Sequence, residues 1–269
     1  MTEIIATGAI AKMRTEFSSP VQYRLPIGDS EVAMNPLIGK RLKLEFLHEI
    51  SCCHCGRKTK KSFSQGYCYP CFTKLAQCDN CIVSPEKCHY DAGTCREPEW
   101  GETHCMIDHY VYLANSSGLK VGITRGTQIP TRWIDQGAHQ ATVILEVPNR
   151  YLAGVGEVAL KNFFSDKTNW RKMLQNNAEA VDWGKARNLA IDSIPNDLKP
   201  YVVRETTEIQ SLTFPVLQYP EKVKSLNLSN TPLYEGKLMG IKGQYLIFED
   251  ATVFNVRSNE GQCVRLSIN

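Results

Sequence analysis

Residues 109–124 read His-Tyr-Val-Tyr-Leu-Ala-Asn-Ser-Ser-Gly-Leu-Lys-Val-Gly-Ile-Thr, and the organisation of the central part of the chain follows from them. From 110 to 114, aromatic or small residues alternate with branched apolar ones, which is the period-2 pattern of a strand with one packed face. The polar turn 115–118 ends in glycine and leads into a second strand-like run at 119–124. The stretch therefore predicts a β-hairpin.

A helix, a third strand and a second helix are expected after the hairpin. Pro130 suits the first turn of a short helix that carries Arg132, and Gly137 suits its end. Residues 141–147 are apolar and rich in β-branched side chains, which favours a strand. Residues 152–164 place their apolar side chains on one broad helical face. The predicted order is β-β-α-β-α.

This order, with its motifs, resembles the GIY-YIG nuclease domain found in homing endonucleases and in the excision-repair endonuclease subunit. Val111-Tyr112-Leu113 stands where that family has its Ile-Tyr-x-Leu half, and Lys120-Val121-Gly122 stands where it has Tyr-Ile-Gly. The resemblance covers residues 109–171. One departure is the replacement of the second tyrosine by Lys120, as in divergent branches of the superfamily.

The resemblance implies metal-dependent hydrolysis of phosphodiester bonds in DNA or RNA. Tyr112 would be a general base or a water-orienting group, and Arg132 would hold the phosphate through its fork of donors. Glu157 would bind a catalytic Mg²⁺ or Mn²⁺. Asn169 stands where the family has an asparagine after the helix, and Lys120 could supply positive charge in place of the missing tyrosine hydroxyl.

A non-catalytic reading of the same residues stays open. The chain could be a nucleic-acid-binding protein that retains the nuclease scaffold but lost its chemistry at Lys120. Taken singly, Tyr112, Arg132 and Glu157 could be an ordinary strand tyrosine, a surface arginine and a helix glutamate facing water. Through residues 120–124 and 136–138, the whole chain also resembles a bacterial family of cysteine-rich proteins of unknown function.

Two Cys-x-x-Cys pairs lie before the hairpin. Cys52 with Cys55, and Cys68 with Cys71, are separated by a length of chain that lets both pairs meet at one tetrahedral Zn²⁺. Cys53 is adjacent to Cys52 and could replace it. Basic residues between the pairs are placed for phosphate contacts, or they form a solvated loop. The residues expected to bind nucleic acid are these four and two more in the central part of the chain: Arg57, Lys58, Lys60, Lys61, Arg125 and Arg171.

A second group of cysteines follows. Cys78, Cys81 and Cys88 are the expected ligands, with Cys95 or Cys105 as the fourth. Zinc is favoured because a short, loop-rich segment with Cys-x-x-Cys pairs usually needs a metal to fold. All-cysteine ligation also suits a 4Fe–4S cluster, which would make the protein an iron–sulfur redox or sensor protein.

The two ends of the chain are rich in strand-like runs. Residues 5–47 are too few to bury a core alone, so we expect them to pack with the C-terminal part, as a small β-barrel-like domain of OB or SH3 type. Such a barrel either binds nucleic acid or is a structural cap. The expected fold class is α+β, with four parts: 1–50, a β segment; 51–107, a cysteine-rich zinc module; 108–205, the GIY-YIG-like domain with trailing helices; 206–269, a C-terminal β domain.

Composition limits the function classes. The net charge of +3 is small, so a nucleic-acid surface would be a local basic patch. No run approaches the roughly 18 apolar residues of a membrane span, and no Walker loop suggests nucleotide hydrolysis. The first residues lack the pattern of a signal peptide, so the 11 cysteines favour metal ligation over disulfides and a cytoplasmic protein.

Overall fold

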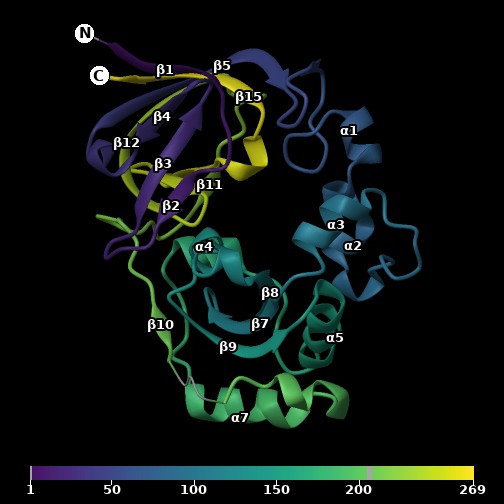
Figure 1. The fold of residues 1–269 in the computed structure, drawn as a ribbon. Helices are drawn as coiled ribbons and strands as arrows, with labels where there is room; N and C mark the ends of the chain where they lie inside the picture. The colour runs from purple at the N-terminus through teal and green to yellow at the C-terminus, as the bar shows by residue number, and fades with distance from the viewer. Residues whose placement is uncertain (1, 205–207) are drawn as a thin grey trace. The chain divides into compact units, whose positions relative to one another are not determined.

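The computed structural model describes residues 2–204 and 208–269. The chain divides into two compact units (Figure 1). Unit 1 contains Met1–Thr73, Leu174–Asn176 and Thr213–Asn269, and unit 2 contains Lys74–Met173 and Asn177–Leu212. The architecture is a mixed α+β fold with several sheets. None of the helices in these described ranges combines the length and apolar character needed to cross a membrane.

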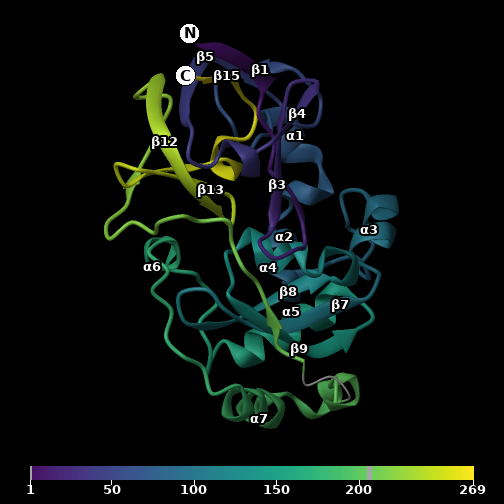
Figure 2. The ribbon, with the colours of Figure 1, turned by 90° about the vertical axis from the view of Figure 1, so that its left-hand side faces the viewer.

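Unit 1 is built on an eight-stranded sheet that joins both ends of the chain (Figure 2). Its order is β1 (Glu3–Ala9), β15 (Gln262–Ile268), β5 (Arg41–Ser51), β12 (Leu233–Lys242), β13 (Tyr245–Phe248), β14 (Thr252–Asn255) and β11 (Lys224–Ser225), and β6 (Lys58–Thr59) pairs with β5. The first strand runs antiparallel to the last, from Glu3 opposite Ile268 to Ala9 opposite Cys263. The order has two ends, β1 and β11, so these strands do not close on each other as in a full barrel.

A second sheet of unit 1 contains β2 (Arg14–Glu16), β3 (Gln22–Ile27) and β4 (Ser30–Ala33). Alternate side chains of β3, those of Tyr23, Leu25 and Ile27, are buried, as the period of a one-sided strand requires. Short 3-10 helices at Asn35–Leu37 (η1) and Arg257–Asn259 (η6) complete the unit. Strand β12 begins at Leu233, directly after the proline at 232.

Unit 2 contains the predicted hairpin. Strands β7 (His109–Asn115) and β8 (Leu119–Arg125) are paired along their whole length, and the sheet order is β10-β9-β7-β8. The remaining elements are η4 (Gly126–Gln128), α4 (Thr131–Asp135), β9 (Gln140–Val147), α5 (Arg150–Leu160), α6 (Trp170–Leu174), α7 (Trp183–Ser193), η5 (Asn196–Tyr201) and β10 (Gln210–Ser211). The order β7-β8-α4-β9-α5 is the one predicted from the sequence.

The core of unit 2 lies between the sheet and helices α5 and α7. Val111 and Leu113 of β7 are fully buried in it, together with residues of β9 and of both helices. Gly156 lets α5 approach the sheet, because a Cβ at this position would lie 2.8 Å from Leu145 Cδ1. At its N-terminus, α5 is capped by Asn149, whose Oδ1 accepts a hydrogen bond from the Leu152 N–H at 2.9 Å. The helix that carries Glu157 is therefore fixed at its start and along its length.

The cysteine-rich segment 51–107 is divided between the two units. Its first part, up to residue 73, belongs to unit 1, and the rest belongs to unit 2. Its helices are all short: α1 (Tyr69–Lys74), η2 (Ala76–Cys78), α2 (Asn80–Val83), η3 (Pro85–Lys87) and α3 (Pro98–His104). The domain boundaries expected at 50/51 and 107/108 therefore differ from those of the two units.

Candidate functional site

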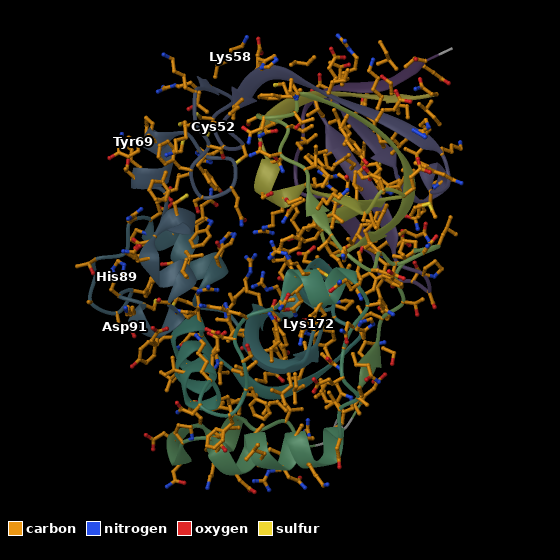
Figure 3. The ribbon with its side chains drawn as sticks, turned by 180° about the vertical axis from the view of Figure 1, so that it is seen from behind. Cys52, Lys58, Tyr69, His89, Asp91 and Lys172 are labelled. Atoms are coloured by element: carbon orange, nitrogen blue, oxygen red, sulfur yellow. The ribbon has the colours of Figure 1, made fainter. Side chains whose placement is uncertain are left out.

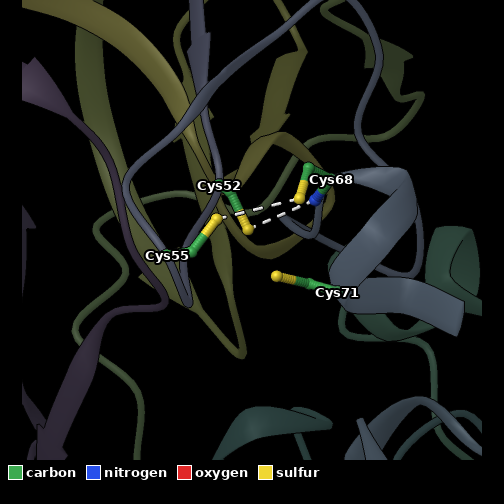
Figure 4. A group of neighbouring side chains, drawn as sticks. All are labelled: Cys52, Cys55, Cys68 and Cys71. Carbon is green, nitrogen blue, oxygen red and sulfur yellow. Dashed lines mark hydrogen bonds between the residues drawn. The ribbon is translucent and has the colours of Figure 1, made fainter. Parts of the chain in front are cut away.

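The first two Cys-x-x-Cys pairs meet in unit 1 (Figure 4). The thiol sulfurs of Cys52, Cys55, Cys68 and Cys71 all lie within 4.8 Å of one another. The Sγ atoms of Cys55 and Cys68 are 3.8 Å apart. Zinc–thiolate bonds of about 2.3 Å place the sulfurs of a tetrahedron about 3.8 Å apart, so the four thiols match a tetrahedral zinc site. The prediction that these four residues form a cluster that could hold a metal such as zinc is confirmed.

Backbone N–H groups around this site favour the thiolate form of Cys52, the form that binds a cation. Cys52 follows β5, and the turn after it returns the Gly56 N–H to the Cys52 carbonyl at 2.9 Å. The Cys68 N–H donates to Cys52 Sγ at 3.2 Å. Although burial alone would raise it, backbone N–H groups of Cys55, Cys68 and His54 lower the pKa of Cys52 to about 6. The thiolate form that binds metal is therefore favoured at this ligand.

The structure decides between Cys52 and Cys53. Cys53 is not part of the cluster. Its side chain packs against Gly66, where an added Cβ would lie 3.0 Å from the Cys53 sulfur. Burial, and then the charge of Glu260, raise the pKa of Cys53 to about 12. Cys53 is therefore a neutral thiol outside the candidate centre.

The basic residues between the two pairs only partly face a common surface. Lys58 and Lys60 line a groove of about 500 Å³ with Phe46, His48 and other residues of unit 1. Lys58 also forms an ion pair with Glu49, with Nζ to Oε1 at 2.8 Å. Lys61 lies over the Phe63 ring at 5.3 Å, and neither it nor Arg57 lines the groove.

The two basic residues expected in unit 2 lie on different elements. Arg125 ends β8, where it pairs with His109. The exposed Arg171 stacks its guanidinium 4.3 Å from the Trp170 ring. An arginine held on a tryptophan presents a flat cationic surface, which suits phosphates and bases.

A second candidate site is a polar cluster in unit 2, which gathers four predicted residues. Tyr112 comes from β7, Lys120 from β8, Arg132 from α4 and Glu157 from α5. Arg132 is hydrogen-bonded to Tyr112, and the charges of Arg132 and Glu157 act on both Tyr112 and Lys120. The Glu157 side chain is only 13% exposed, so it does not face solvent as an ordinary surface glutamate would.

Tyr112 is the centre of this cluster and is fully buried, with 1% of its surface exposed. Its hydroxyl accepts a hydrogen bond from Gln136 Nε2 at 3.1 Å. Gly122, its partner on β8, makes room for it, because a Cβ at this position would lie 2.6 Å from the Tyr112 hydroxyl. The glycine of the Lys120-Val121-Gly122 motif is therefore required by the tyrosine of the other strand.

Burial opposes the charged forms in this cluster. Burial, followed by the charge of Arg132, lowers the pKa of Lys120 to about 8. Burial raises the pKa of Tyr112, which Arg132 partly offsets. Burial also raises the pKa of Glu157, although Lys161 lies 3.5 Å away and opposes the shift. The cluster holds more positive than negative groups, which favours an anion such as phosphate.

The resemblance gives Asn169 a position but no role, and in the structure its side chain caps a helix. Its Oδ1 accepts a hydrogen bond from the Lys172 N–H at 3.2 Å, and its own N–H donates to Ser117 Oγ at 2.9 Å. These are the bonds of a residue that caps the start of α6. The contacts of Asn169 link it to a turn and a helix, and none joins it to Tyr112 or Glu157.

Two residues of the cluster were missed from the sequence. Gln136 bonds to Tyr112, and the charge of Arg150 acts on Glu157. Arg150 and Glu157 are seven residues apart on α5, so they share one face of the helix. That spacing was visible in the sequence. The contact of Gln136 depends on the return of the chain after α4, which no local pattern encodes.

The later cysteines, in unit 2, are not as closely grouped as the first four. Cys81, Cys88, Cys95 and Cys105 line one pocket. Cys78 is buried and does not line this pocket, so its expected place among the ligands stays a prediction. The tightly grouped metal-binding atoms in this part of the described chain are those of Asp79, Cys81 and His89.

Comparison with known proteins gives one match. The family model described as "Protein of unknown function (DUF2797)" matches residues 39–264. No curated protein and no solved structure matches the chain.

Proposed function

The chain belongs to the DUF2797 family of proteins of unknown function, and we propose that it is a metal-dependent nuclease of GIY-YIG type acting on DNA or RNA. The observation that carries the proposal is the convergence of Tyr112, Lys120, Arg132 and Glu157 from four separate elements on one polar cluster. Four residues without a common role would not be expected to come together from four separate elements. The resemblance implies a role for each of these four residues from its position in the sequence alone.

In this proposal the exposed Arg132 meets the phosphate, and its hydrogen bond to buried Tyr112 fixes the guanidinium. Lys120 adds positive charge where the nonbridging oxygens develop negative charge. Glu157 would hold Mg²⁺ or Mn²⁺, an ion that supplies Lewis-acid polarisation of the phosphate and an activated water. Because the pKa of Tyr112 is raised, its hydroxyl stays protonated at neutral pH and orients its neighbours.

The four-cysteine site of unit 1 would contain zinc in a structural role. Its four thiols leave no position open for a substrate, as is typical of structural zinc. The groove lined by Lys58 and Lys60 lies on the same unit and would contact the nucleic-acid backbone.

The test is a cleavage assay with duplex, branched and single-stranded DNA and structured RNA, in Mg²⁺ or Mn²⁺. We expect wild type to cleave one of these and Glu157→Gln to lose cleavage while retaining its fold. Asp192→Asn, which changes an exposed carboxylate on α7, is the matched control and should cleave like wild type. Equal cleavage by Glu157→Gln and wild type would refute the assignment of Glu157.

A non-catalytic nucleic-acid-binding protein is the second candidate. The full burial of Tyr112 and the lysine at position 120 favour it, because a nuclease needs a water near the phosphate and the family's second tyrosine is absent. Binding by wild type without cleavage of any substrate, unchanged in Glu157→Gln, would support this candidate instead.

A further inference from the structure

Four cysteines of unit 2 line one small pocket. Cys81 lies on α2, Cys88 follows η3, Cys95 lies on the next loop and Cys105 follows α3. The free space in the pocket is about 10 Å³, roughly the space needed by one water molecule.

The four thiols are neighbours, although they do not all lie within 4.8 Å of one another as those of unit 1 do. Cys81 interacts electrostatically with Cys88 and Cys105, and Cys105 interacts with Cys88 and Cys95. Gly101 keeps α3 close to the pocket, since an added Cβ would lie 3.5 Å from the Cys95 sulfur and 2.9 Å from the Tyr90 ring. Each thiol therefore has another of the set as its neighbour.

The two other metal-binding side chains nearby already have partners. The Asp79 carboxylate accepts a hydrogen bond from the Asn80 N–H at 2.6 Å and pairs with Arg96 at 2.7 Å. His89 bonds through Nδ1 to Thr94 Oγ1 at 2.8 Å, and Figure 3 shows it on the outer side of its segment. The cysteines are thus the better ligand set for a soft metal.

We propose that Cys81, Cys88, Cys95 and Cys105 bind one zinc ion in unit 2, separate from the site of unit 1. A four-thiolate set completes the coordination of zinc. A free space of about 10 Å³ is closer to the size of a single ion than to that of a 4Fe–4S cube. The segment 76–105 consists of one-turn and two-turn helices, which cannot bury enough apolar surface to fold firmly without such a link.

This zinc site would fix helix α5. The Arg150 N–H donates to the Cys105 carbonyl at 2.8 Å, and Arg150 Nη2 donates to the Ile82 carbonyl at 2.6 Å. Cys105 is one of the proposed ligands, and Ile82 directly follows the proposed ligand Cys81 in the chain. Further along α5, a Cβ at Gly154 would lie 2.4 Å from the Glu86 N atom, so η3 packs directly on the helix. The ion would therefore stabilise the position of the helix that presents Glu157, whether or not the protein is a nuclease.

Native mass spectrometry and elemental analysis of the full chain test the proposal. We expect one zinc ion for each four-thiol set, so two per chain, in wild type. Cys88→Ser and Cys95→Ser should each lose one ion and retain the other, while Cys78→Ser, which changes a buried cysteine outside the pocket, should retain both.

A second measurement uses wild type alone, so it does not require any variant to fold. Stepwise removal of zinc from wild type by a chelator should increase amide hydrogen exchange in residues 150–160 when the unit 2 ion leaves. One zinc ion per wild-type chain would overturn the proposal, as would iron with sulfide, or unchanged zinc content in both Cys88→Ser and Cys95→Ser.

Discussion

Gly122→Ala tests the packing of the hairpin against its own tyrosine. The added methyl would lie 2.6 Å from the Tyr112 hydroxyl and 2.8 Å from Cζ of the same ring. Tyr112 cannot move into solvent, because it is fully buried and packed edge-on against Trp133 at 6.0 Å. The ring or strand β8 must therefore shift, and the hydrogen bond from Gln136 is strained or lost.

The expected cost follows from these contacts. Overpacking a filled core costs about 1–3 kcal/mol, and loss of a neutral hydrogen bond costs about 1 kcal/mol. The free energy of unfolding should therefore fall by about 2–4 kcal/mol. Urea unfolding followed by circular dichroism measures this change. Gly184→Ala, near the start of α7, is the control: its added Cβ would make an ordinary contact of 3.5 Å with Asp182 Oδ1, so the variant should not destabilise the protein.

A double-mutant cycle makes the test specific. Tyr112→Phe removes the hydroxyl that the new methyl would meet, so Gly122→Ala should cost less in the Tyr112→Phe background than in wild type. A change below about 0.5 kcal/mol for Gly122→Ala alone, typical of an unimportant surface site, would refute the reasoning. If Gly122→Ala lowered the unfolding free energy equally in wild type and in Tyr112→Phe, the Tyr112 hydroxyl would not be the group that clashes with the added methyl.

Three further outcomes are expected. Cys52→Ser should lose the zinc of unit 1 and lower the thermal midpoint, whereas Cys53→Ser should retain the zinc; equal zinc contents would contradict the ligand assignment. Burial lowers the pKa of Lys242 to about 7, so the folded state binds fewer protons than the unfolded state, whose lysine titrates near 10.4. We therefore expect the difference in unfolding free energy, wild type minus Lys242→Met, to rise between pH 7 and about 10.4. A difference that stays constant across this range would show that Lys242 is charged in the folded state. Lys58→Ala with Lys60→Ala should weaken nucleic-acid binding and reduce its salt dependence by about one unit of log–log slope per phosphate contact, which a fluorescence titration at several salt concentrations measures.

Local patterns predicted the elements and the first metal cluster well. The hairpin 109–124 follows from alternation and a glycine turn, and both are encoded within a few residues. The cluster of Cys52, Cys55, Cys68 and Cys71 follows from two short repeats and a spacer of suitable length. Neither result depends on distant contacts.

Tertiary contacts explain what the sequence did not reveal. The spacing of Cys78 and Cys81 is that of a ligand pair; Cys81 lines the pocket of unit 2, whereas Cys78, at the end of a 3-10 turn, does not. Asn169 stands at the position the resemblance requires, and its side chain also caps the start of α6. In both cases the residue type is compatible with more than one role, and the pattern of neighbouring residues does not distinguish them.

The pairing of β1 with β15 has a consequence for how the protein folds during synthesis. Glu3 pairs with Ile268, so the central sheet of unit 1 contains contacts of nearly the greatest sequence separation that this chain allows. The residues of unit 2 are all synthesised before β12 to β15, since unit 2 ends at Leu212. Unit 2 can therefore begin to fold before the central sheet of unit 1 is complete, whereas β1 lacks β15, and β5 lacks β12 and β15, until these strands are made.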